Sequence, residues 1–172
     1  MEWQQLLIDS FEGARQALEK ALANLSPADL NEQPHHDCNS MGWLAWHLTR
    51  TQDRAMSNLT GEQQVWIKDG WYTKFNRDPN PQDTGFGHKS EDVAKFKSPD
   101  AGTLLGYHRA VLERSKRYLG SLSTTELGRK VDHPKFPTVG AWLVATLSDS
   151  LQHVGQVAYL RGLLKGKGWM NL

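Results

Sequence analysis

Apolar residues recur every three or four positions along four long segments of this chain, and this periodicity constrains its fold more than any other feature. The segments span about residues 2–25, 40–59, 99–122 and 138–164. The first segment carries Trp3, Leu7, Phe11, Ala14, Leu18, Leu22 and Leu25 at this spacing. No stretch alternates apolar and polar residues beside a second stretch of the same kind, so strands are not expected. The sequence therefore predicts an all-α fold in which amphipathic helices pack as a four-helix bundle.

The connections between these segments differ in length. A Ser-Pro pair at residues 26–27 predicts a further short helical turn, Asn39 or Ser40 can cap the second helix, and residues 98–100 begin the third. The connection over about residues 60–97 is long and rich in Gly, Pro, Asp and aromatic residues. Because long connections in compact domains usually serve function, we expect this one to wall a pocket. Such long crossovers also allow the second and third helices to run parallel.

Length and charge exclude several classes of protein. The 172 residues are enough for a single domain over residues 1–172. Twenty Lys and Arg against 19 Asp and Glu leave a net charge of +1, so nucleic acid is not an expected partner. The longest apolar run, about residues 139–147, is far below the roughly 20 residues that cross a bilayer. Without a basic start before an apolar stretch, and with Cys38 as the single cysteine, we expect a soluble, cytoplasmic protein with no membrane partner.

Three residues on two predicted helices could share a metal ion. Asp149 and His153 are four residues apart, so they lie on one face of the last helix. Taken alone, this pair is better explained as a buried hydrogen bond, since an inward carboxylate needs a partner. His47 on the inward side of the second helix changes that balance, because metal sites in bundles use side chains of facing helices. Two imidazoles and a carboxylate suit Zn²⁺, Ni²⁺ or Fe²⁺ and leave positions open for water or substrate.

The remaining histidines are weaker candidates. His88 follows a glycine-flanked loop and could line a pocket, although an exposed position is equally compatible. His108 lies on the inner face of the third helix, where it is either a core residue or a support for the metal ligands. Residues 35–38 are expected to form a solvated turn with a free thiol, and His133 is expected to be exposed. The tryptophans expected in the core or in a dimer contact are Trp43, Trp46 and Trp142.

Three stretches in this order resemble a known bacterial family of four-helix proteins, the DinB-like superfamily. They are NSMGWLAWHLTRTQDR, DGWYTKFNRDPNPQDTGFGH and PTVGAWLVATLSDSLQHVGQVAYLRGLL, and the WHL and HVGQ motifs are the most specific parts. The superfamily includes bacillithiol and mycothiol S-transferases and the mycothiol-dependent maleylpyruvate isomerase. The resemblance implies a metal held by one His of the second helix and two ligands of the fourth, here His47, Asp149 and His153. The family often has His where this chain has Asp149, and some members carry an acidic residue there.

The resemblance implies a metal-dependent small-molecule enzyme, most simply a thiol-dependent S-transferase that uses Zn, Ni or Fe. Its partners would be a low-molecular-weight thiol as cosubstrate and an electrophile, because a metal-bound thiol is deprotonated and the thiolate is the nucleophile. The alternative is a non-enzymatic metal- or ligand-binding bundle in stress response, whose metal site would be closed by His88 or His108. The resemblance and the abundance of tryptophan also predict a homodimer.

Overall fold

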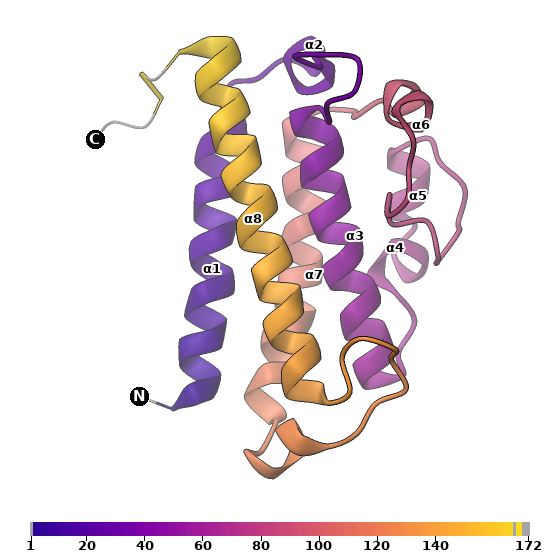
Figure 1. Cartoon of the computed structure of the whole chain (residues 1–172), viewed down its shortest axis with the longest axis vertical. Coiled ribbons are helices and arrows are strands. Elements are labelled where there is room, and N and C mark those ends of the chain that lie inside the picture. The colour runs from indigo at the N-terminus through magenta and orange to yellow at the C-terminus, as the bar shows by residue number, and fades with distance from the viewer. Residues whose placement is uncertain (1, 167, 170–172) are drawn as a thin grey trace.

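Four long helices form the body of the protein in the computed structural model, which describes residues 2–166, 168 and 169. They are α1 (Trp3–Leu22), α3 (Met41–Thr60), α7 (Ala101–Ser121) and α8 (Val139–Lys165), shown in Figure 1. The connections contain the short helices α2 (Pro27–Asn31), α4 (Val65–Lys68), α5 (Trp71–Lys74) and α6 (Ser90–Lys95) and the 3₁₀ helix η1 (Thr125–Gly128). Over the described residues no strand forms, and a single isolated bridge joins Lys130 and Thr138. The predicted all-α bundle is therefore confirmed; residues 1, 167 and 170–172 of the predicted domain lie outside the described part.

Contacts between the helices define how they are ordered and oriented. Helix α3 packs against α7 and α8, and α1 packs against the same two helices. Ion pairs join Glu19 to Arg109 and Glu12 to Lys116, so α1 and α7 are antiparallel. Thr49 of α3 contacts His108 of α7, and Gln52, later on α3, contacts Ser115, later on α7. Helices α3 and α7 therefore run parallel, as Figure 1 shows, and the connection between them crosses the length of the bundle.

Side chains placed just before the helices decide where these begin. Ser26 and Asp29 form a reciprocal capping box at α2, as the Ser-Pro pair predicted. Ser40 caps α3 and Thr138 caps α8 by accepting from backbone N–H groups of the first turn. Helix α7 is capped by Asp100, whereas the backbone of Ser98 bonds to Asn31, the last residue of α2. Each observed boundary lies within three residues of its prediction.

The apolar faces of the long helices meet in two clusters. One contains Trp43 and Trp46, and the other contains Trp142 with Phe11 and Leu143. All three tryptophans are at most 9% exposed, so they belong to the core of the protomer. No helix among the described residues has the length and hydrophobicity needed to cross a membrane.

A buried ionic cluster on α3 holds the long connection in place. Arg50 and Asp53 are fully buried, 3.6 Å apart. The Asp53 carboxylate accepts from the backbone N–H groups of Val65 and Trp66, at 2.9 and 2.8 Å, and from the Tyr107 hydroxyl at 2.8 Å. The start of α4 is thereby tied to α3, and burial followed by the charge of Asp53 raises the pKa of Tyr107.

The guanidinium of Arg50 reaches the later part of the same connection. It donates to the side chain of Gln64 at 2.8 Å and to the carbonyl of Asp83 at 3.0 Å. It also donates to the carbonyls of Asn80 and Pro81, at 3.2 and 3.3 Å. Since a buried charge must be fully hydrogen-bonded, this residue orders backbone that has no regular structure of its own.

Replacing Asp53 by Ala should destabilise the protein strongly. The change removes the acceptor of three hydrogen bonds and leaves the buried Arg50 without its counter-charge. We expect the free energy of unfolding, measured by urea titration, to fall by about 3–5 kcal/mol. Asp78→Ala, at an exposed position on the same connection, should change it by less than about 0.5 kcal/mol. A loss below about 1 kcal/mol in Asp53→Ala would contradict this role.

His108 on α7 is buried between α3 and α1. Its Nδ1 lies 3.2 Å from the Thr49 hydroxyl, which itself donates to the Ala45 carbonyl and therefore accepts from the imidazole. The other ring nitrogen, Nε2, has no hydrogen-bond partner among the described residues. Burial, followed by the charge of Arg15, lowers the pKa of His108 to about 4.

This histidine should make the protein less stable as the pH falls from about 6.5 to about 4. The unfolded state binds the proton near pH 6.5 and the folded state only near pH 4, so the unfolded state binds more protons in that window. Its share of the lost free energy of unfolding is about 3 kcal/mol. Urea titrations across the window should show a shallower decline for His108→Gln than for the wild type, whereas exposed His36→Gln should follow the wild type. Equal declines in all three proteins would exclude His108 as the cause.

Candidate metal centre

His47, Asp149 and His153 lie together between α3 and α8. One ligand atom from each lies within 4.8 Å of the other two. His47 is 6% exposed, and the two residues of α8 are half-buried one turn apart. The rings of His47 and His153 meet edge to face with their centroids 4.8 Å apart. The structure therefore brings together the three residues that the sequence singled out as candidate ligands.

The orientation of His47 is set by the long connection. Its Nδ1 bonds to the backbone carbonyl of Thr84, and because a carbonyl only accepts, Nδ1 carries the proton. The lone pair of the imidazole is thus on Nε2, and the Trp43 ring stacks on the imidazole at 4.7 Å. Burial lowers the pKa of His47, although the bond to Thr84 opposes this. The ring is therefore held in the neutral form, which is the form that binds metals. Metal-binding histidines commonly donate their other ring N–H to a backbone carbonyl, as His47 does here.

Asp149 and His153 are each oriented by a further residue. The Thr51 hydroxyl lies 2.8 Å from Asp149 Oδ2, and Gln156 Oε1 accepts from His153 Nδ1 at 2.7 Å. The inner atoms, Asp149 Oδ1 and His153 Nε2, are 3.3 Å apart. Burial opposes ionisation of both groups, but their mutual contact and the outer hydrogen bonds outweigh it, so the pKa of Asp149 is lowered and that of His153 raised.

This donor set fits a divalent metal. Each of the three residues has an outer atom occupied by a hydrogen bond and an inner atom that faces the group. Two imidazole nitrogens and one carboxylate oxygen are ligands of Zn²⁺, Ni²⁺ and Fe²⁺. Within the described part of the chain the group has three protein ligands, so a bound metal would keep positions for an outside ligand.

The carbonyl of Thr84 reaches His47 because Gly85 follows it. Gly85 has a φ of 85°, and a Cβ there would lie 2.7 Å from the Trp43 ring and 2.9 Å from the Trp46 ring. No other residue type fits this close approach without displacing a ring. The glycines on either side of Phe86 indicated a tight loop from the sequence, but they did not indicate that this loop contacts His47.

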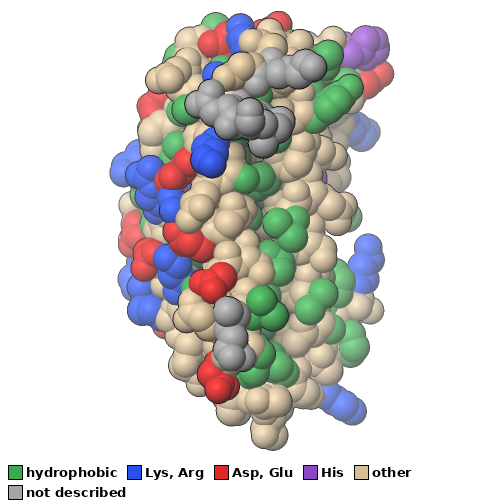
Figure 2. Space-filling view, turned by 90° about the vertical axis from the view of Figure 1, so that its left-hand side faces the viewer, with side chains coloured by type: hydrophobic (Ala, Val, Ile, Leu, Met, Phe, Trp, Pro, Cys, Tyr) green, Lys and Arg blue, Asp and Glu red, His purple; other side chains and the backbone are tan. Residues whose placement is uncertain are grey.

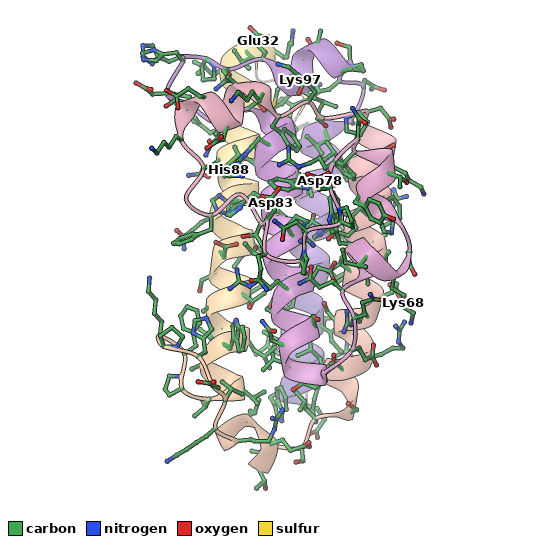
Figure 3. The ribbon with its side chains drawn as sticks, turned by 90° about the vertical axis from the view of Figure 1, so that its right-hand side faces the viewer. Glu32, Lys68, Asp78, Asp83, His88 and Lys97 are labelled. Carbon is green, nitrogen blue, oxygen red and sulfur yellow. The ribbon has the colours of Figure 1, made fainter. Side chains whose placement is uncertain are left out.

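His88 does not face the candidate metal centre directly but bonds to Trp43, the residue that stacks on His47. Its Nδ1 accepts from Trp43 Nε1 at 3.2 Å, and its Nε2 donates to Asp83 at 3.1 Å. Asp83 is paired with Arg77 at 2.6 Å. Burial opposes the ionisation of Asp83, but this pair, followed by the charge of His88, lowers the pKa of Asp83. Figure 3 shows Asp83 and His88 on the connection that passes over α3. Both nitrogens of His88 are engaged, so it supports Trp43, which stacks on His47.

The two histidines proposed as a fourth ligand are therefore elsewhere. His108 is buried in the core and bonds to Thr49, and His88 bonds to Trp43 and Asp83. Neither joins the group of candidate ligands. The exposed residues His35, His36 and Asp37 form a second group of possible ligands, which agrees with the predicted solvated turn.

A pocket of about 360 Å³ opens beside Asp149. The long connection contributes only Thr84 and Phe86 to it, and much of the remaining wall is formed by residues 133–136 before α8. His133, expected to be exposed, is half-buried there, with its ring 4.6 Å from that of Phe136 and 4.5 Å from that of Trp142. The expectation was wrong because ring packing covers a segment that has no helical periodicity.

A second pocket has a volume of about 420 Å³. It is lined by Gln156, which bonds His153, and by Leu44, Tyr159 and the half-buried Cys38. Cys38 thus lies outside the pocket that contains Asp149.

Comparison with known proteins identifies the family of this chain. The family model of the DinB superfamily matches residues 10–157, which include all three candidate ligands. A solved structure described as the conserved protein of a locus from Enterococcus faecalis matches with a TM-score of 0.88 and 29% identity, over 97% of this chain and 99% of that chain. None of the curated proteins matches. The chain therefore belongs to the DinB superfamily, as its motifs predicted.

Proposed function

We propose that the protein is a divalent-metal-dependent small-molecule enzyme, a thiol-dependent S-transferase of the DinB type. The observation that carries this proposal is the group of three ligands, His47, Asp149 and His153, beside a pocket large enough for a small molecule. Zn, Ni or Fe held by these residues would lower the pKa of a thiol that binds it, so that the thiolate is present at neutral pH.

Thr84, Thr51 and Gln156 would keep the three metal ligands in place, and the pocket beside Asp149 would admit the second substrate. The thiolate lone pair forms a bond to an electrophilic carbon, while the leaving group departs with the electron pair of its own bond to that carbon. The proton of the thiol is released to solvent. No side-chain nucleophile takes part, and Cys38 lies outside the pocket that contains Asp149.

The alternative function is a non-enzymatic metal- or ligand-binding bundle in stress response. That function favours a site closed by a fourth protein ligand. The positions of His88 and His108, both outside the ligand group, support the open site of an enzyme instead.

We also propose that the protein is a homodimer. Helix α8 is apolar on its outer face as well as its inner face, and such helices are normally buried. Val144, Leu151, Tyr159 and Leu163 of α8, together with Leu6 of α1, are between 50% and 71% exposed. Figure 2 shows a band of hydrophobic side chains along this side of the bundle. A second copy of the chain would cover that band.

Metal analysis tests the ligand set. Protein purified without a metal-affinity tag should contain a divalent ion, and His47→Ala, Asp149→Ala and His153→Ala should each lose it, because each removes a ligand atom from the group. His36→Ala, in the exposed second group, should retain it. Elemental analysis measures all five proteins. Full retention in Asp149→Ala would show that the carboxylate only hydrogen-bonds to His153.

A conjugation assay tests the reaction. Metal-loaded protein should accelerate the displacement of chloride from 1-chloro-2,4-dinitrobenzene by bacillithiol, mycothiol, glutathione or coenzyme A, followed by absorbance. His47→Ala and His153→Ala should lower kcat/KM by about a hundredfold or more. Cys38→Ser should keep full activity, since the protein's thiol is not the nucleophile. If no thiol reacts faster than with the metal-free protein, the non-enzymatic alternative is the better account.

Sedimentation velocity tests the dimer. At micromolar concentration the wild type should sediment as a species of twice 19.4 kDa. The double variant Val144→Asp with Leu151→Asp should shift it to the monomer, because it places charge in the proposed contact. Arg117→Asp, exposed on α7, should remain dimeric. A wild type that sediments only as a 19.4-kDa species would overturn the proposal.

A further inference from the structure

The pocket beside Asp149 contains an arginine, Arg54, that forms no ion pair with any residue the structure describes. Arg54 of α3 is half-buried and lines this pocket. The other buried or half-buried arginines donate to at least one carboxylate, carbonyl or other acceptor: Arg15, Arg50, Arg77, Arg114 and Arg161. Arg54 has no such partner among the residues that the structure describes. Because burying a charge is costly without a counter-charge, this position favours an anion that comes from outside the protein.

A second cation lines the same pocket. Lys135 lines the pocket, and its ammonium lies 6.0 Å from the centre of the Phe86 ring. It forms no ion pair within the described ranges, 2–166 and 168–169. Burial, followed by the charges of Arg54 and Lys135, lowers the pKa of His133, which lines the same pocket. Asp149, the carboxylate in this lining, is already engaged by Thr51 and His153. The pocket therefore keeps an excess of positive charge.

Aromatic rings form the rest of the walls. Phe136 and Trp142 line one side, where the His133 ring packs between them, and Phe86 lines the pocket from the long connection with 82% of its surface exposed. Rings on both sides of a pocket favour a flat, apolar ligand. Alanines at positions 55 and 145 leave room between them.

The pocket also fixes how such a ligand would lie. Arg54 is seven residues after His47 on α3, which is about 10 Å along the same face of the helix. Thr51 and Asp149 line the space between them. A ligand of one ring with its acid group on Arg54 would therefore extend toward the candidate metal centre.

We propose that this pocket binds small aromatic carboxylates, with Arg54 and Lys135 recognising the carboxylate and the rings of Phe86, Phe136 and Trp142 holding the apolar body. As the substrate class of the enzyme this rests on the proposed transferase function: the electrophile is an aromatic acid whose reactive carbon faces His47, Asp149 and His153. Binding itself requires neither the thiol nor the metal.

Calorimetry with an unreactive pair of ligands tests the recognition. We expect 4-nitrobenzoate to bind at least about tenfold more tightly than neutral 4-nitrobenzamide, since the acid gains a charge-assisted hydrogen bond. Arg54→Gln should remove that preference, and Lys135→Gln should reduce it by about threefold, because Lys135 is more exposed. Arg117→Gln removes an exposed charge on α7 and should change nothing. Circular dichroism checks that each variant is folded.

The metal must be excluded as the anion's partner. The titrations are therefore run on metal-loaded and on metal-free protein, and the preference should persist in both. Equal affinity for acid and amide, or a preference that survives Arg54→Gln, would overturn the proposal. A preference found only in the loaded protein would overturn it as well, since the carboxylate would then be binding the metal.

Kinetics separate this proposal from the proposed function. With the thiol that reacts, 4-chloro-3-nitrobenzoate should give a higher kcat/KM than 4-chloro-3-nitrobenzamide, and Arg54→Gln should raise the KM for the acid. In this reaction the carbon–sulfur bond forms as chloride leaves with its electron pair. Conjugation without preference for the acid would refute the anion pocket alone. Preferential binding of the acid without conjugation by any thiol would refute the transferase alone.

Discussion

The buried pair of Arg50 and Asp53 is the constraint on which the rest of the structure depends. Two fully buried charges in the middle of α3 must find hydrogen-bond partners, and their own separation of 3.6 Å is too long for a direct hydrogen bond. The partners are backbone groups of the connection between α3 and α7, together with the side chains of Gln64 and Tyr107. These bonds hold the connection against α3, and they thereby stabilise the parallel arrangement of α3 and α7.

The same anchoring shapes the candidate metal centre. Arg50 binds the carbonyl of Asp83, and the carbonyl of the next residue, Thr84, accepts from His47. Helix α3 thus carries both a candidate ligand and, one turn later, the side chain that secures the partner of that ligand. Gly85 lets the backbone lie directly on Trp43 and Trp46. The tautomer of His47 is therefore a consequence of how the connection is held.

The pocket beside the centre is assembled from three separate parts of the chain. Helices α3 and α8 supply Arg54, Thr51 and Asp149, the long connection supplies Phe86, and the segment before α8 supplies Lys135 and Phe136. The candidate metal ligands lie on the two helices, whereas much of the pocket wall comes from the two connections.

Periodicity in the sequence determined the four long helices, and it determined that His47, Asp149 and His153 share the inward faces of two of them. This was possible because helical geometry is local: residues four apart lie on one face whatever the chain does elsewhere. Only the tertiary structure decided the partial burial of His133, the engagement of both nitrogens of His88 and the absence of a partner for Arg54 among the described residues. They depend on contacts between residues far apart in the sequence, across connections that have no repeating pattern, and no local rule specifies which distant group meets which.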